Sequence, residues 1–191
     1  SLRIRQDFLI AQALQAPYAT NDTDDDFALQ MALARIRQLS AHEVGHTIGL
    51  AHNFAASSKG RASVMDYPHP MLSMRNGKVD FSNAYDTKIG DWDKVAIAYS
   101  YSEFQQNEQA QLLKLLDDAF KNGARFISDQ DARPQGSAHA YAHLWDNGAN
   151  VASELENLLA LRKQAIAKFS TDNIKSSQPY SVLEDVFVPL Y

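Results

Sequence analysis

Eleven consecutive residues, HEVGHTIGLAH, constrain this chain more than any other segment. His42 and His46 are four residues apart, so a helix would carry both imidazoles on one face, where they can reach one metal ion. Glu43 would point to a neighbouring face, where its carboxylate can hydrogen-bond a metal-coordinated water without ligating the metal. Gly49 can adopt a left-handed conformation and turn the chain off the helix. His52 would then return to the metal as a third ligand.

Zinc is the metal that this donor set favours, because a catalytic zinc ion takes three protein ligands and keeps one open position. The complete pattern HExxHxxGxxH is more specific than HExxH alone. The chain contains no cysteine, so a thiolate ligand is excluded and His, Asp, Glu or Tyr must hold any metal. The sequence therefore predicts that His42, His46 and His52 bind Zn²⁺.

A second motif, SVMDYP, follows at residues 63–68. The two motifs together resemble the metzincin clan of zinc endopeptidases, in which a tight turn carrying a methionine lies beneath the three histidines. Met65 matches that methionine, and Gly49 matches the glycine at which the helix ends. Tyr67 matches a tyrosine that approaches the zinc in astacin-like and serralysin-like members and stabilises the tetrahedral intermediate.

Longer segments narrow the resemblance. SAHEVGHTIGLAHNFAAS, RASVMDYPHP, KIGDWDKVAIAYSY and LWDNG are similar to the Met-zincin domains of large bacterial exported proteins. The resemblance implies a zinc metallopeptidase that acts on a peptide or protein substrate, with Glu43 as general base and Tyr67 as a second catalytic group. It also implies export to the periplasm, the cell surface or the medium.

Composition excludes other functional classes. The 191 residues are 45% hydrophobic and 21% charged, with a formal net charge of −5, which is ordinary for a globular protein. Lys and Arg are scattered, so no basic face indicates nucleic-acid binding. No apolar run approaches the roughly 20 residues that a membrane-spanning helix needs.

Periodicity and breakers predict a mainly α fold with one β-hairpin. The hairpin turns at Asn76–Gly77, and a capping box formed by Ser181 and Glu184 starts a last short helix. A short strand is expected at ARFIS, and leucines of the later helices are expected in the core: Leu112, Leu113, Leu115, Leu116, Leu158, Leu159 and Leu161. The other helices are expected at residues 2–15, from 27 to about 51, 92–101 (as a buried helix), 108–123 with Gly123 as C-cap, and 151–169.

The predicted domain organisation has two parts. Residues 1–103 form the active-site helix, zinc motif and Met-turn of a metzincin-like catalytic domain, and residues 104–191 form a helical C-terminal subdomain packed on it. The clan has a twisted sheet before the active-site helix, whereas residues 1–41 are predicted to be helical. We expect this sheet to lie upstream of Ser1 in a longer natural chain, with the upstream domains as partners; counting it, the fold would be α+β.

Several alternatives stay open at this point. The chain could be a non-catalytic zinc-binding or interaction domain, although zinc binding alone does not require Glu43, or a zinc hydrolase of a non-peptide amide. His139, Tyr141 and His143 could form a second metal site, a wall of the substrate cleft or a locally satisfied loop. The start of the long helix is rich in acidic residues: Asp22, Asp24, Asp25 and Asp26. These residues favour a capped helix, with Thr23 or Asp24 as N-cap, over a calcium site.

Overall fold

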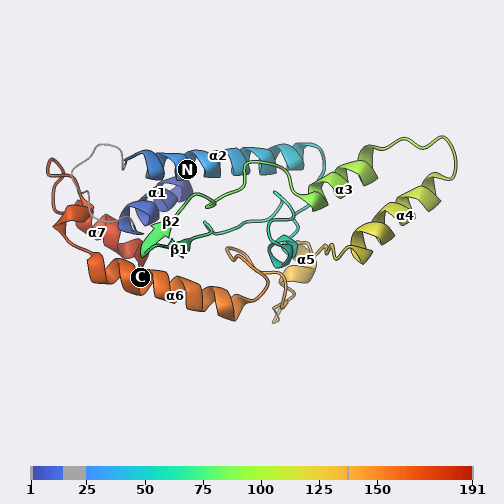
Figure 1. The fold of residues 1–191 in the computed structure, drawn as a ribbon. Coiled ribbons are helices and arrows are strands. Elements are labelled where there is room, and N and C mark those ends of the chain that lie inside the picture. Colours follow the sequence, from blue (N-terminus) through green and yellow to red (C-terminus); the bar gives the residue numbers. More distant parts are fainter. Residues whose placement is uncertain (1, 15–24, 137, 191) are drawn as a thin grey trace. The chain divides into compact units, whose positions relative to one another are not determined.

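The chain folds into a mainly α-helical structure with one small antiparallel sheet (Figure 1). The computed structural model describes residues 2–14, 25–136 and 138–190. The predicted fold class, mainly α with one hairpin, is confirmed for these residues. Among them no helix combines the length and the apolar character needed to cross a bilayer.

Residue contacts divide the chain into two compact units, each built from segments that are distant in sequence. Unit 1 comprises Ser1–Arg37, Pro70–Tyr85 and Ala152–Tyr191, and unit 2 comprises Gln38–His69 and Asp86–Val151. The boundaries of these units differ from the expected division of the chain after residue 103. That division into two domains stays a prediction.

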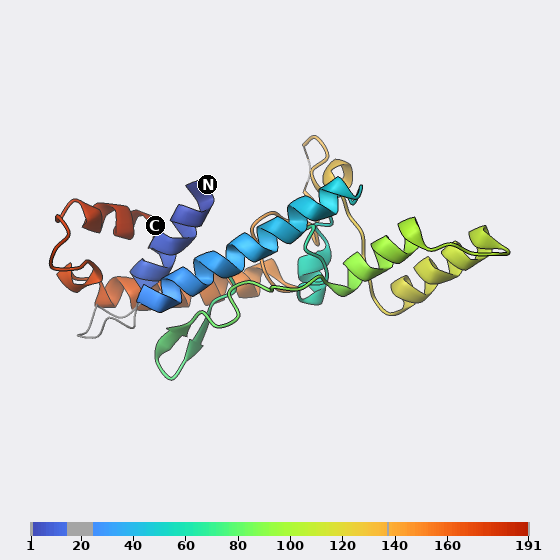
Figure 2. The same cartoon turned by 90° about the horizontal axis from the view of Figure 1, so that it is seen from above.

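Most helices of unit 1 come from the two ends of the sequence. Helix α1 (Leu2–Leu14) packs beside α7 (Val182–Phe187) and the 3₁₀ turn η3 (Val188–Leu190) that follows it (Figure 2). The helices predicted at residues 2–15 and 151–169 and the predicted last short helix are confirmed. The predicted capping box is wrong, because Ser181 has helical backbone angles and its side chain accepts no cap hydrogen bond. The bounds are α1 (Leu2–Leu14), α6 (Val151–Lys168), η2 (Thr171–Asn173), α7 (Val182–Phe187) and η3 (Val188–Leu190).

The predicted hairpin is also in unit 1. Strands β1 (Ser73–Arg75) and β2 (Lys78–Asp80) pair antiparallel, with Met74 opposite Val79. Asn76 and Gly77 both have positive φ, at 53° and 73°, which is the conformation that a two-residue type I′ turn requires. The hairpin prediction is therefore confirmed.

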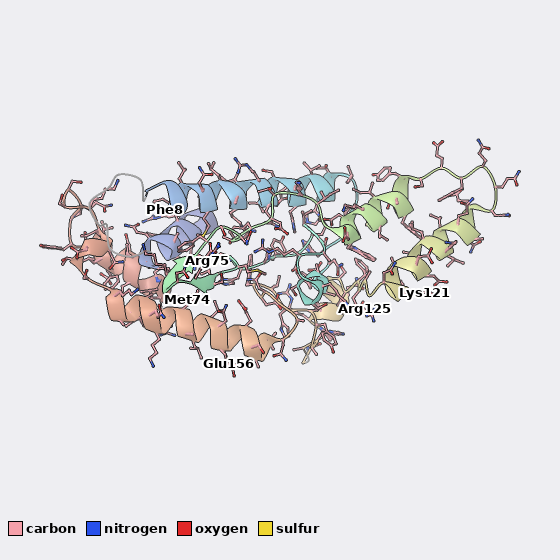
Figure 3. All side chains as sticks on the ribbon, in the orientation of Figure 1. Phe8, Met74, Arg75, Lys121, Arg125 and Glu156 are labelled. Carbon is pink, nitrogen blue, oxygen red and sulfur yellow. The ribbon has the colours of Figure 1, made fainter. Side chains whose placement is uncertain are left out.

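The core of unit 1 gathers side chains from α1, the first part of α2 (Asp25–Thr47), α6 and the hairpin. Phe8 and Met74 (labelled in Figure 3) pack against buried residues that include Leu161. Leu158 joins this cluster, but Leu159 is 50% exposed. Positions three apart on a helix share a face, whereas the residue next to Leu158 points elsewhere, so the prediction of Leu159 as core was wrong.

Helix α2 (Asp25–Thr47) confirms the long helix predicted to start near residue 27. Its first part belongs to unit 1 and its last part to unit 2. The helix ends at Thr47, four residues before the predicted end, because Gly49 adopts a left-handed φ of 84°. The proposed caps Thr23 and Asp24, together with Asp22, lie outside the described residues.

Unit 2 holds the end of α2 and four short helices. Helices α3 and α4 lie side by side in both views (Figures 1 and 2). Gly123, at φ 88°, closes α4, and the next residue, Ala124, donates its N–H back to Ala119 O at 3.0 Å. This confirms Gly123 as the helix-ending glycine. The bounds are η1 (Ala56–Lys59), α3 (Asp91–Tyr101), α4 (Glu108–Lys121) and α5 (Asp129–Ala132).

Three expectations for unit 2 need correction. Leu113 is exposed on α4, so it is not a core residue. Helix α3 is buried at Trp92 but exposes Tyr99 and Tyr101, so it is only partly the buried helix that we predicted. Residues 124–128 form no strand, because the side chain of Asn53, rather than a partner strand, takes up much of their hydrogen bonding.

Candidate metal centre

The three histidines of the motif converge at the end of α2. His42 and His46 lie on its last turns, and Leu50 donates its N–H to Gly45 O at 3.0 Å as the chain turns at Gly49. This turn returns His52 to the other two rings. One side-chain nitrogen from each histidine lies within 4.8 Å of the others, a grouping that could hold a metal ion.

Hydrogen bonds fix the tautomer of each imidazole. His42 Nδ1 lies 2.7 Å from Val64 O, and His46 Nδ1 lies 2.9 Å from Leu50 O. His52 Nδ1 lies 2.7 Å from a carboxylate oxygen of Asp129. Carbonyl and carboxylate oxygens accept, so each Nδ1 carries the proton and donates it. In the neutral ring each Nε2 is then left with a lone pair, the form that a metal requires.

The three Nε2 atoms fit a zinc ion. His42 Nε2 is buried without a hydrogen-bond partner among the described residues. His46 Nε2 and His52 Nε2 face each other at 3.1 Å with no proton to share, an arrangement that a cation between them would stabilise. Tetrahedral zinc with Zn–N bonds of about 2.0–2.1 Å separates its ligands by roughly 3.3 Å. The donor set and its spacing therefore suit Zn²⁺.

Burial helps to keep this site neutral. His42 is fully buried, and desolvation lowers the pKa of its imidazole below the ordinary value. Burial disfavours the imidazolium form. The Nε2 lone pair of His42 therefore remains available at neutral pH.

Met65 lies directly beneath α2, as the Met-turn prediction requires. Its side chain is 1% exposed and packs with Leu50 and Val64. A Cβ atom built on Gly45 would lie 2.3 Å from Met65 Sδ. Only a glycine between the two helical histidines allows the methionine to approach this closely.

Asp93 of α3 holds the Met-turn and was not found by sequence reasoning. Its buried carboxylate accepts hydrogen bonds from Ser63 Oγ at 2.5 Å, Val64 N at 2.8 Å and Gly90 N at 2.6 Å. The bond from Gly90 is half of a capping box, since Asp93 is the third residue of α3. An acidic residue at the third position of a helix is a sequence signal for a capping box. No sequence signal indicated its contacts with the Met-turn.

Tyr67 contacts two of the three histidines, His42 and His52. Its hydroxyl oxygen lies 3.1 Å from His52 Nε2, and its ring centroid lies 4.6 Å from that of His42. Trp145 packs on the same ring at 5.2 Å and donates its backbone N–H to Tyr67 O at 2.8 Å. The structure thus brings Tyr67 to the cluster, as its place in the motif predicts.

Glu43 follows His42 on α2 and is exposed. Its carboxylate makes no hydrogen bond or ion pair with another described residue, and its charge acts on His42. It is therefore available to a solvent molecule beside the cluster.

Asp129, at the start of α5, also escaped the sequence analysis. It lies 77 residues from His52, as the first residue of a four-residue helix, so no periodicity connects the two. The neighbouring backbone is tied to the motif, because Phe54 donates its N–H to Ile127 O at 2.9 Å.

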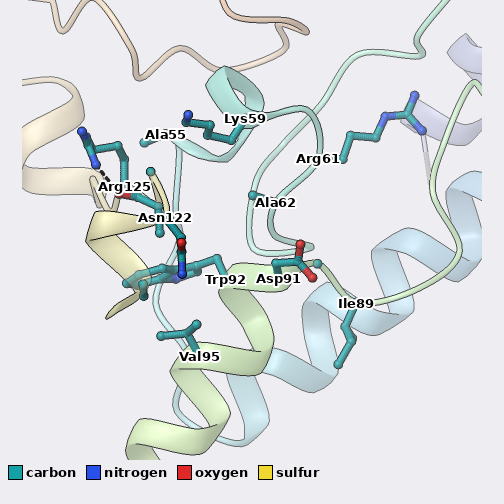
Figure 4. A pocket seen from close by; sticks show the side chains of 14 residues that line it. Ala55, Lys59, Arg61, Ala62, Ile89, Asp91, Trp92, Val95, Asn122 and Arg125 are labelled. Carbon is teal, nitrogen blue, oxygen red and sulfur yellow. Dashed lines mark hydrogen bonds between the residues drawn. The ribbon is translucent and has the colours of Figure 1, made fainter. Parts of the chain in front are cut away.

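Other candidate residues do not join the cluster. His139 Nδ1 accepts the backbone N–H of Tyr141 at 3.1 Å, the behaviour of a locally satisfied loop. The only grouping of three possible metal ligands found in the described part of the chain is that of His42, His46 and His52. Unit 2 also contains a cavity of about 700 Å³ between η1, α3 and α4, with Trp92 and Asn122 in its wall (Figure 4); none of the motif histidines lines it.

A helix carrying two histidines, a left-handed glycine, a third histidine and a buried methionine turn together define a metzincin-like zinc site. The Met-zincin family matches residues 24–191, and the chain belongs to this family. No curated protein and no solved structure matched the chain.

Proposed function

We propose that this protein is a zinc-dependent endopeptidase with His42, His46 and His52 as the metal ligands. The observation that carries the proposal is the convergence of three Nε2 lone pairs, each fixed by a hydrogen bond at Nδ1. Membership of the Met-zincin family supports it. Export, implied by the resemblance to exported bacterial proteins, is part of the same proposal.

Glu43 acts as the general base in this proposal. Bound zinc supplies Lewis acidity, which can lower the pKa of a coordinated water from 15.7 to about 7. Glu43 takes the proton of the attacking water and passes it to the leaving amine, as a positioned carboxylate can. Its exposure and its lack of a competing partner among the described residues leave it free for this role.

Tyr67 acts as a hydrogen-bond donor to the developing oxyanion. Its hydroxyl lies beside the Nε2 atom of His52, where the scissile carbonyl would be polarised. A donor placed before the reaction stabilises the charge that develops on that oxygen. The rings of His42, His52 and Trp145 hold the phenol in place.

Peptide binding by this chain is expected to be weak. Metalloprotease substrates often bind by strand addition, which provides main-chain hydrogen bonds and register. In the described residues the only sheet is the short β1–β2 hairpin. A high KM for peptides is the consequence.

Glu43 variants test the function. We expect the wild-type protein to bind one zinc ion and to cleave a peptide from a mixed library, and Glu43→Gln and Glu43→Ala to retain the zinc but lose hydrolysis. Glu108→Gln, which removes an exposed glutamate from the first turn of α4, is the control and should cleave normally. Equal turnover by Glu43→Gln would refute Glu43 as the base, and turnover of non-peptide amides alone would refute an endopeptidase.

A further inference from the structure

We infer that Asp129 is the positioning residue of the third metal ligand, fixing both the tautomer and the ring direction of His52. The inference concerns the imidazole itself and holds in the metal-free protein. Its consequence for zinc affinity rests on the proposed function.

His52 needs a partner of a different kind from the other two histidines. His42 and His46 stand on α2, and backbone carbonyls of Val64 and Leu50 accept their Nδ1 protons. His52 lies beyond the end of the helix, in a segment without regular secondary structure. The acceptor at its Nδ1 is a side chain, Asp129 Oδ2, at 2.7 Å.

The carboxylate makes this acceptor strong and directional. A hydrogen bond to an ionised acceptor is roughly twice as strong as one between neutral groups. His52 is therefore held with Nδ1 protonated and with Nε2 directed at His46 Nε2.

Asp129 is itself oriented by its neighbours. Its other oxygen, Oδ1, lies 3.8 Å from the guanidinium of Arg133, one turn later on the chain. Arg133 in turn lies over the ring of Phe54, 5.7 Å from the centroid. Each carboxylate oxygen thus has one partner, and Phe54 is only two residues from the histidine that Asp129 holds.

The backbone around Asp129 is attached to the same stretch of chain. Asn53 donates its Nδ2–H to Arg125 O at 2.9 Å and accepts the N–H of Ile127 at 3.2 Å. Phe54 N–H also bonds to Ile127 O. These contacts hold residues 125–127 against residues 53 and 54, so the two segments that carry His52 and Asp129 are joined by hydrogen bonds other than the one between these two side chains.

Zinc affinity measured by competition with a chromophoric chelator tests the inference. Loss of such a carboxylate partner typically weakens metal binding 10–100-fold, and we expect this of Asp129→Ala. Asp131→Ala is the matched control, because it removes the same charge from an exposed position of the same short helix and should bind zinc as the wild type does. Equal zinc affinity of Asp129→Ala and Asp131→Ala would overturn the inference.

A second measurement keeps the test independent of folding defects and of zinc. Long-range ¹H–¹⁵N NMR of the metal-free protein should show His52 protonated at Nδ1 in the wild type and in Asp129→Asn, whose carbonyl oxygen can still accept. Asp129→Ala should show a mixture of the two tautomers. A His52 tautomer that is unchanged in Asp129→Ala would refute the positioning role, whereas a wild type that has the expected tautomer but binds no zinc would refute only the proposed function.

Discussion

His42 donates a 2.7 Å hydrogen bond to the carbonyl oxygen of Val64, and the N–H of the same Val64 donates at 2.8 Å to the buried carboxylate of Asp93. One residue of the Met-turn therefore connects a histidine that we propose as a metal ligand to α3, a helix that contributes none of the proposed ligands. Gln38, one turn before His42 on α2, donates to the same carbonyl oxygen at 3.2 Å. The orientation of the His42 ring depends on how firmly this turn is held.

Replacing Asp93 should therefore weaken both the fold and the metal site. Asp93→Ala removes three hydrogen bonds to a buried carboxylate, and a hydrogen bond to a charged group is worth about 1.5–3 kcal/mol. We expect the free energy of unfolding in urea to fall by at least about 3 kcal/mol, together with weaker zinc binding. Asp91→Ala, an exposed acidic residue of the same helical turn, should change little. If Asp93→Ala lowered the free energy of unfolding no more than Asp91→Ala does, Asp93 would not hold the turn.

A methyl group at Gly45 should be destabilising despite the helix. In an exposed helix, Gly→Ala raises the free energy of unfolding by about 1 kcal/mol. Here, however, the new Cβ would meet Met65 Sδ. We expect Gly45→Ala to lower the free energy of unfolding by about 1–3 kcal/mol, the usual cost of overpacking. Adding Met65→Val, which shortens the methionine, should restore part of the loss. A more stable Gly45→Ala protein would mean that Met65 moves aside without cost.

Tyr67→Phe separates catalysis from metal binding. The substitution removes the hydroxyl near His52 but leaves the ring contacts with His42 and Trp145. We expect kcat to fall roughly 10²–10³-fold, as for loss of an oxyanion donor, with zinc affinity nearly unchanged. Tyr180→Phe, at an exposed position outside the proposed site, should retain full activity. Unchanged kcat in Tyr67→Phe would remove this residue from the mechanism.

Asp66 should make the fold less stable at alkaline pH. Burial, reinforced by the nearby Asp146 carboxylate, raises the pKa of Asp66 from 3.8 to about 8, against the opposing hydrogen bonds from Tyr67 N and Ser57 N. The folded state thus binds a proton that the unfolded state has lost above pH 4. This contribution to stability is full below the unfolded pKa and disappears as pH rises through 8.

Urea unfolding of the metal-free protein at pH 7 and pH 9 measures this effect. We expect the wild type to lose about 1 kcal/mol between these values and Asp66→Asn, which cannot ionise, to lose clearly less. The range avoids the region near pH 6.5, where the lowered pKa of His42 gives the opposite slope. Asp117→Asn, on the exposed face of α4, should behave as the wild type. Parallel losses in wild type and Asp66→Asn would contradict a raised pKa.

Local sequence signals identified the three histidines that we propose as ligands and the helix that presents two of them. The spacing of His42 and His46, the left-handed Gly49 and the turn at Asn76–Gly77 are set by interactions within a few residues. A sequence pattern reports such interactions directly, which is why the turn at Gly49 and the hairpin could be predicted.

The residues that support the site could not be predicted in the same way. Asp93 and Asp129 act on positions 29 and 77 residues away. The place of Asp93 in the first turn of α3 is a local signal for helix capping, but no local pattern connects either residue to the histidine motif. The exposure of Leu113 and Leu159 has a related cause, because it depends on which helix face finds a neighbour. These features depend on long-range packing. A local sequence pattern does not report which distant segments will come into contact.

The 77 residues between His52 and Asp129 also set an order of events during synthesis. At about 5–20 residues per second, a ribosome adds that length in roughly 4–15 s. For that interval all three histidines exist while the third is without its carboxylate. We expect nascent chains arrested before residue 129 to capture zinc more weakly than chains arrested after the α5 segment has emerged, so that metal loading follows the translation of a segment lying far outside the histidine motif.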